Sequence, residues 1–204
     1  MLNGPGGAIE VLVDEANLPA GATPRGVAVI AHPHPLFGGT MDNKVVHTLA
    51  RAFVQCGWRA VRFNFRGVGK SQGVYDDGRG ELDDMLALVQ RFAPVEEPFA
   101  LAGFSFGAYV AAKALGSLWP TRQAQTTVLV GLASSRFAVP ALPTQAASSV
   151  LIVHGEVDDT VPLASVLDWA RPQGLPVTVL PGADHFFHGQ LPALRELIAR
   201  HIRC

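Results

Sequence analysis

The sequence alternates between short, almost purely apolar segments and longer segments with helical periodicity. The short segments are rich in Val, Ile, Leu and Phe, which is typical of parallel strands that are buried on both faces and joined by crossover helices. We expect an alternating strand first, at Ile9–Val13, and then buried strands at Val27–Ala31, Arg59–Phe65, Phe99–Gly103, Thr127–Leu132, Val150–His154 and Val177–Leu180. The pattern predicts an α/β fold with a mainly parallel central sheet.

Helices are expected in the segments that connect these strands, on both faces of the sheet. In the first of them Asp42 is the expected N-cap, and Gly57 follows the end of the apolar stripe. The linkers are short and contain proline, and no repeat or low-complexity segment marks a second domain. The chain is therefore predicted to form a single domain over residues 1–204, with helices at Asp42–Gln55, Glu81–Phe92, Phe106–Leu118, Leu163–Ala170 and Leu191–Ile202.

The charge balance argues against two classes of partner. With 16 basic and 17 acidic residues and a formal net charge of −1, the chain predicts neither nucleic-acid binding nor attachment to an anionic membrane. The first residues lack the pattern of a signal peptide, and no run of about 18 apolar residues occurs, so we expect a cytoplasmic protein. The two cysteines, Cys56 and Cys204, form neither a disulfide framework nor a zinc-type cluster.

Ser105 lies in the segment Gly103-Phe104-Ser105-Phe106-Gly107, after an apolar strand and before an alanine-rich helix. This is the context of a Gly-x-Ser-x-Gly nucleophile elbow, whose sharp turn needs residues without side chains on either side of the serine. The turn exposes the hydroxyl at the carboxyl end of the sheet, and the N-terminus of the helix directs partial positive charge toward it. Ser105 is therefore the candidate nucleophile.

A serine hydroxyl is a weak nucleophile at neutral pH, so a histidine must accept its proton and a carboxylate must orient that histidine. In this type of fold the order along the chain is Ser, Asp, His. The loop after the strand Val150–His154 contains Asp158, the preferred acid, with Asp159 and Glu156 as alternatives that could equally cap the loop.

His185 follows the last expected strand and is the candidate general base. His188 could belong to the start of the final helix, and together with Asp184 it could form part of a metal site. No third ligand with suitable spacing accompanies them, so neither a metal nor another cofactor is expected. His154 is interpreted as a structural residue.

The loop from His32 to Gly39 follows the strand Val27–Ala31, where hydrolases of this type supply one oxyanion donor. The other donor is expected to be the N–H of Phe106. Pro33 and Pro35 have no N–H, which leaves His34 as the first candidate and Leu36 as the second. The oxyanion hole is thus predicted to contain the backbone N–H groups of His34 and Phe106.

Two further patterns need an interpretation. The segment Gly67–Ser71 is similar to the end of a phosphate-binding Gly-x-x-x-x-Gly-Lys-Ser loop, but Asn64 stands where the first glycine is required, so nucleotide binding is not expected. Several phenylalanines lie near the predicted catalytic loops and form either an apolar acyl pocket or ordinary core: Phe37, Phe104, Phe106, Phe186 and Phe187.

These motifs together resemble the α/β-hydrolase superfamily, and within it the small serine hydrolases without a lid that are related to the dienelactone hydrolases. The resemblance spans nearly the whole chain and implies nucleophile Ser105, acid Asp158, base His185 and the two oxyanion donors above. The chain differs from dienelactone hydrolases proper, which have cysteine in place of Ser105. It also has only the segment from Ser134 to Ser149 where lipases insert a lid, so no cap domain is expected.

The expected reaction is hydrolysis of a small or medium acyl ester through an acyl-enzyme intermediate, with a small molecule as the only partner. An acyl-thioesterase, a peptidase or an acyltransferase could use the same residues, and a catalytically silent binding protein could share the fold. The sequence does not address the oligomeric state.

Overall fold

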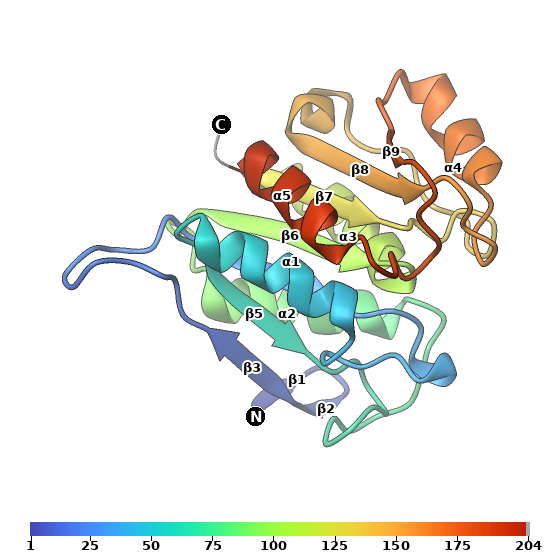
Figure 1. Cartoon of the computed structure of the whole chain (residues 1–204). Helices are drawn as coiled ribbons and strands as arrows, with labels where there is room; N and C mark the ends of the chain where they lie inside the picture. Colours follow the sequence, from blue (N-terminus) through green and yellow to red (C-terminus); the bar gives the residue numbers. More distant parts are fainter. Residues whose placement is uncertain (203–204) are drawn as a thin grey trace.

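The computed structural model describes residues 1–202, and it centres on a seven-stranded sheet with the strand order β3-β5-β4-β6-β7-β8-β9 (Figure 1). Only β3 runs antiparallel to its neighbour β5, and the other adjacent strands are parallel. The α/β fold and the mainly parallel sheet are therefore confirmed. The strands are β3 (Val11–Asp14), β4 (Val27–Ala31), β5 (Arg59–Phe63), β6 (Phe99–Phe104), β7 (Thr126–Val130), β8 (Val150–Gly155) and β9 (Thr178–Leu180).

Helices cover both faces of this sheet, as the sequence predicts. On one face lie α1 (Lys44–Gln55) and α5 (Leu191–Ile202), which pack side by side (Figure 1). The other face carries α2 (Gly80–Phe92), α3 (Phe106–Leu118) and α4 (Leu163–Ala170). Short 3₁₀ turns complete the described elements: η1 (Pro35–Phe37), η2 (Thr144–Ser149) and η3 (Arg171–Gln173).

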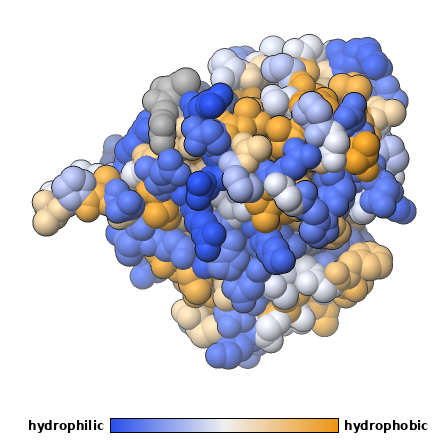
Figure 2. Space-filling view, viewed as in Figure 1, coloured by the Kyte–Doolittle hydropathy of each residue, from blue (hydrophilic) through white to orange (hydrophobic). Residues whose placement is uncertain are grey.

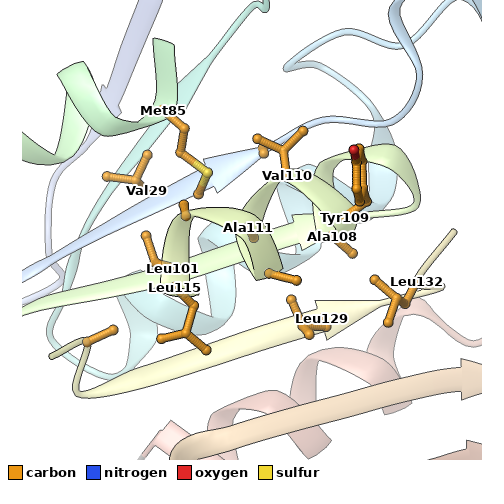
Figure 3. Packing of buried hydrophobic residues seen from close by; sticks show 14 of the residues in the cluster. Val29, Met85, Leu101, Ala108, Tyr109, Val110, Ala111, Leu115, Leu129 and Leu132 are labelled. Carbon is orange, nitrogen blue, oxygen red and sulfur yellow. The ribbon is translucent and has the colours of Figure 1, made fainter. Parts of the chain in front are cut away.

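The core is divided by the sheet into two apolar layers. Figure 3 shows the layer under α2 and α3, where Met85 and Val110 from the helices lie against Val29 and Leu101 from the strands. Both sides of β4, β6 and β7 are buried, which explains why these segments contain almost no polar residues.

The N-terminal segment differs from the expected single strand at Ile9–Val13. A two-stranded hairpin of β1 (Leu2–Gly4) and β2 (Gly7–Ile9) comes first, and β3 begins only at Val11. Glu10 separates them because its N–H donates to Ser71 Oγ at 2.9 Å. A side-chain partner distant in sequence thus interrupts the strand, although the alternation of apolar and polar residues predicts a continuous one.

The start of α1 and the end of β5 also differ from expectation. Asn43, rather than Asp42, caps α1, and its Oδ1 accepts the N–H of Val45 at 2.8 Å. Asp42 Oδ1 instead lies 3.4 Å from the guanidinium of Arg62. β5 ends at Phe63, and the carbonyl oxygen of the next residue, Asn64, accepts the hydroxyl of Ser71 at 2.7 Å instead of a strand partner.

Cys56 is buried and free, whereas Cys204 lies outside the described residues. Within residues 1–202, no helix combines the length and the apolar character needed to cross a bilayer.

Candidate active site

Ser105 occupies a strained turn between β6 and α3. Its φ of 57° and ψ of −115° lie in the left-handed half of backbone space, which non-glycine residues rarely adopt. A Cβ at Gly103 would lie 2.1 Å from the carbonyl oxygen of Gly107, and a Cβ at Gly107 would lie 2.3 Å from that of Ala31. Both glycines are therefore required by backbone contacts, which explains the spacing of the motif.

Ser105, His185 and Asp158 form one hydrogen-bonded chain. Ser105 Oγ lies 3.1 Å from His185 Nε2, and His185 Nδ1 lies 2.6 Å from Asp158 Oδ2. All three residues are less than 9 % exposed. They come from loops after β6, β9 and β8, three parallel strands whose carboxyl ends meet at one edge of the sheet. The short His185–Asp158 contact fixes the imidazole with Nδ1 protonated, so Nε2 faces the serine as an acceptor.

The loop after β8 distinguishes Asp158 from its two neighbours. Asp158 Oδ1 accepts the N–H groups of Val161 at 2.7 Å and Thr160 at 3.0 Å, so both oxygens have partners. Asp159 is exposed, and its Oδ1 accepts the hydroxyl of Thr160 at 3.3 Å, whereas Glu156 Oε2 accepts the N–H of Gly182. Of the three carboxylates weighed from the sequence, the structure brings only Asp158 to His185.

Asp158 remains an anion although it is buried. Burial acts to raise its pKa, but the hydrogen bonds from His185 and from Val161 N–H outweigh burial and hold the pKa below its ordinary value. A fixed negative charge beside His185 stabilises the imidazolium that proton transfer from Ser105 would create.

His154 makes a second contact with Asp158 that sequence reasoning did not anticipate. Its Nε2 lies 2.8 Å from the carbonyl oxygen of Val161 and 3.3 Å from Asp158 Oδ2. Burial lowers the pKa of His154, so the ring is neutral and donates from Nε2. His154 therefore ties the acid to the end of β8.

His34 and Phe106 line the same pocket as Ser105, and their ring centroids lie 5.1 Å apart. Phe106 is the first residue of α3, so its N–H has no acceptor within the helix. His34 precedes η1, and its Nδ1 accepts the N–H of Leu36 at 3.2 Å. The N–H of Leu36, the second donor candidate, is therefore already bound to the side chain of His34. Burial lowers the pKa of His34, whose Nε2 lies 3.2 Å from the hydroxyl of Tyr75.

The pocket in front of Ser105 has a volume of about 390 Å³. Its walls are mostly apolar, and three of the five phenylalanines singled out from the sequence line it: Phe37, Phe106 and Phe186. Phe104 and Phe187 do not line it and are fully buried in the core, with Phe104 packed beneath His185 at 4.9 Å between ring centroids. The side chain of Phe106 is fully buried as well. For Phe104 and Phe187 the interpretation as core is the correct one.

The segment after β7 supplies wall residues that sequence reasoning missed, namely Ala133, Arg136 and Phe137. They form no motif, and the only signal that could have found them is their position after the carboxyl end of a parallel strand. Arg136 is the one charged side chain among the described residues that line the pocket.

The other two sequence patterns have structural explanations. Asp184 Oδ2 lies 2.6 Å from His188 Nδ1 at the surface, and no group of three potential ligands for a metal ion occurs in residues 1–202. In the segment Gly67–Ser71, the N–H of Lys70 donates to Glu10 Oε2 at 2.8 Å. This N–H holds the loop against the N-terminal strands instead of facing an open phosphate site.

Comparison with known proteins gives a consistent set of relatives. Residues 22–157 match the family model described as serine aminopeptidase, S33. A structure of an α/β serine hydrolase homologue from Coxiella burnetii is 42 % identical, with a TM-score of 0.86, and the match covers 98 % of this chain and 94 % of that one. An α/β serine hydrolase without a lid from Xanthomonas campestris is 35 % identical, with a TM-score of 0.88 and coverage of 99 % and 91 %.

A curated relative, an uncharacterized protein of Rickettsia prowazekii, is 42 % identical over 112 residues. That match covers 53 % of this chain and 45 % of the relative, so the chain spans less than half the length of that protein. The family model ends at residue 157, one residue before Asp158. It therefore includes the serine turn but neither Asp158 nor His185.

Proposed function

Because this chain belongs to the α/β-hydrolase superfamily, as a serine hydrolase without a lid, we propose that it cleaves small or medium acyl esters through Ser105, His185 and Asp158. The observation that carries the proposal is the buried hydrogen-bonded chain from Asp158 to a serine on a strained turn. The hydroxyl of Ser105, at the end of this hydrogen-bonded series, faces an apolar pocket that suits an acyl group.

In the first half of the proposed reaction, Ser105 Oγ attacks the ester carbonyl carbon while His185 Nε2 accepts the hydroxyl proton. The negative charge that forms on the carbonyl oxygen is stabilised by the N–H groups of Phe106 and His34, and by the N-terminus of α3. The ester C–O bond then breaks, and His185 returns the proton to the leaving alcohol. An acyl group remains on Ser105.

In the second half, water takes the place of the alcohol. His185 accepts a proton from the water as its oxygen attacks the acyl carbon, and it then protonates Ser105 Oγ when the acid leaves. Asp158 stays ionised throughout, because its pKa is held low in the folded protein. No cofactor takes part in this scheme.

The family model is described as serine aminopeptidase, but the lining of the pocket favours an ester over a peptide substrate. An aminopeptidase must bind the positively charged amino group of its substrate. Among the described residues that line the pocket there is no carboxylate, and the charged group is the cation of Arg136. A free ammonium group would be repelled there, whereas an acyl chain can pack against Phe137, which is only partly buried.

The nucleophile is tested by intact-mass analysis after treatment with a fluorophosphonate. We expect one covalent adduct on the wild-type protein and none on Ser105→Ala. An unlabelled wild type would favour a silent binding protein, and an undiminished adduct on Ser105→Ala would reject Ser105.

The substrate class is tested with nitrophenyl esters, acyl thioesters and peptide amides ranked by kcat/KM. We expect esters to rank first. Rapid turnover of thioesters beside negligible turnover of esters would overturn this choice and favour an acyl-thioesterase on the same residues.

A further inference from the structure

A groove with basic walls lies between α1 and α5, on the face of the molecule that Figure 1 presents. Its volume is about 390 Å³, and its lining residues are Lys44, His47, Thr48, Arg51, Leu191, Pro192 and Arg195. No acidic side chain is among these described residues. Hydrophilic residues predominate where α1 crosses the middle of this face (Figure 2).

Three cations without a partner among the described residues line this one groove. Within residues 1–202, the side chains of Lys44, Arg51 and Arg195 have no hydrogen bond or ion pair, and all three residues are exposed. Five arginines elsewhere are paired with carboxylates, at Arg59–Glu15, Arg62–Asp14, Arg66–Asp84, Arg79–Asp76 and Arg171–Asp168. The groove thus concentrates positive charge in a protein whose net charge is −1.

A third cavity joins this groove to the pocket of Ser105. It shares Asn43 and Phe186 with that pocket, and it shares Lys44 and Leu191 with the basic groove. The cavities therefore adjoin from the nucleophile, past Phe186, to the cations on α1 and α5. Among the described residues that line them, the one carboxylate is Asp42, whose Oδ1 lies 3.5 Å from His47 and 3.4 Å from Arg62.

This path begins where the leaving group of an ester must lie. His185 returns a proton to the leaving group in the proposed reaction, so that group has to be next to the imidazole. Phe186 follows His185 directly and forms the first part of the path. The part of the pocket lined by Ala133 and Phe137, which do not border the third cavity, is left for the acyl group.

We propose that the basic groove binds a phosphate on the leaving group, so that the substrate is an acyl ester or thioester whose alcohol or thiol part is phosphorylated. This inference rests on the proposed function of Ser105 and names its substrate class. From Lys44 to Arg51 the groove follows seven residues of α1, about 10 Å at 1.5 Å per residue. The leaving group has to cross the connecting cavity before it meets these cations, and methanol or ethanol is too short to do so, whereas an extended phosphorylated arm is not.

The proposal is tested with two matched pairs of substrates. Butyryl-coenzyme A and S-butyryl-N-acetylcysteamine share a thioester, and 1-butyryl-glycerol 3-phosphate and monobutyrin share an ester, but only the first of each pair carries phosphate. In at least one pair, we expect a KM for the phosphorylated member that is about tenfold lower, the size of two exposed charge contacts. This ratio should fall toward one in the Arg51→Ala/Arg195→Ala double variant and as salt is raised.

Arg91→Ala is the matched control, since it removes an exposed arginine from α2 on the other face of the sheet. We expect it to keep the wild-type ratio. A preference in the thioester pair alone identifies a phosphorylated thiol carrier, and a preference in the ester pair alone identifies a phosphorylated glycerol. Equal KM values within both pairs, or an unchanged ratio in the double variant, would overturn the proposal.

Direct binding separates a failure of this inference from a failure of the proposed function. Titration calorimetry with coenzyme A and with glycerol 3-phosphate on Ser105→Ala measures the groove without turnover, and fluorophosphonate labelling measures the nucleophile without the groove. If the double change Arg51→Ala/Arg195→Ala abolishes binding, the result supports a phosphate site in the groove, whatever the fluorophosphonate labelling shows. Absence of binding by both probes refutes it even where nitrophenyl esters are cleaved.

Discussion

At the scale of single residues, Asp158 is held from both sides. Oδ2 contacts His185, and Oδ1 accepts two backbone N–H groups of its own loop. Replacing Asp158 by Asn keeps the shape but offers His185 an amide, which favours the wrong imidazole tautomer. We predict that Asp158→Asn lowers kcat toward nitrophenyl butyrate by about 10⁴-fold, while the circular dichroism spectrum stays native.

Asp159→Asn is the matched control for this prediction, because Asp159 is adjacent in sequence and exposed. Its kcat should stay within a factor of about two of the wild type, as expected for a surface change. If Asp159→Asn causes the large loss and Asp158→Asn does not, the acid has been assigned to the wrong neighbour.

The sequence identifies which types of residue can form the catalytic site, but it does not show which way their side chains point. The spacing of Gly103 and Gly107 identifies Ser105, because any other residue there would clash with backbone. Asp158 and Asp159 are chemically identical neighbours, and only the path of the loop decides which one faces His185. For the same reason the contact between His154 and Asp158 was not predictable, since it joins a strand end to a loop through space.

At the scale of elements, two glycines of α3 have opposite roles. Gly107 packs against the carbonyl oxygens of Ala31 and His32. At Gly116, by contrast, no atom of residues 1–202 lies within 4 Å of an added Cβ. We predict that Gly107→Ala lowers the free energy of unfolding by about 1–3 kcal/mol through overpacking. Gly116→Ala should raise it by about 0.5–1 kcal/mol, because alanine is the better helix former. Urea denaturation of both variants checks the contrast, and two changes of the same sign would contradict it.

The connection between β4 and η1 contains a buried histidine that does not face the site. His32 Nδ1 lies 2.6 Å from the carbonyl oxygen of Pro33, and its Nε2 accepts the N–H of Phe65. Burial lowers the pKa of His32 to about 4. As pH falls below about 6.5, the unfolded chain takes up this proton while the folded protein does not. Stability is therefore lost between pH 6.5 and the folded pKa, by about 3 kcal/mol from this group.

NMR titration of the imidazole nitrogens checks this prediction directly, and we expect the neutral Nδ1–H form to persist well below pH 6. The slope of unfolding free energy against pH should also be shallower in His32→Gln than in the wild type. A His32 resonance that titrates near pH 6.5 in the folded protein would refute the argument.

At the scale of the whole molecule, the pocket is assembled from five loops that follow β4, β6, β7, β8 and β9. The sequence predicted the sheet and helices because their periodicity is local, and it predicted Ser105 because a sharp turn restricts its own neighbours. It did not predict Arg136 and Phe137, nor the basic groove, since residues from separate elements meet there only after folding. The cations of α1 and α5 are likewise invisible in a net charge of −1.

This assembly also sets which acyl chains fit. Phe137 is stacked on Tyr109 at 4.8 Å between ring centroids and packs on Phe106, so it forms a firm end to the apolar side of the pocket. In a nitrophenyl ester series from acetate to laurate, we predict that kcat/KM is highest for a short or medium chain. Phe137→Ala should move this maximum to longer chains, because each added methylene can then be buried, for about 0.8 kcal/mol each. Phe92→Ala, on α2 and away from the pocket, removes an equal ring and should leave the maximum in place. A maximum that Phe137→Ala does not move would show that the acyl chain leaves the pocket on another side, and the direction assigned to the leaving group would then have to be reversed.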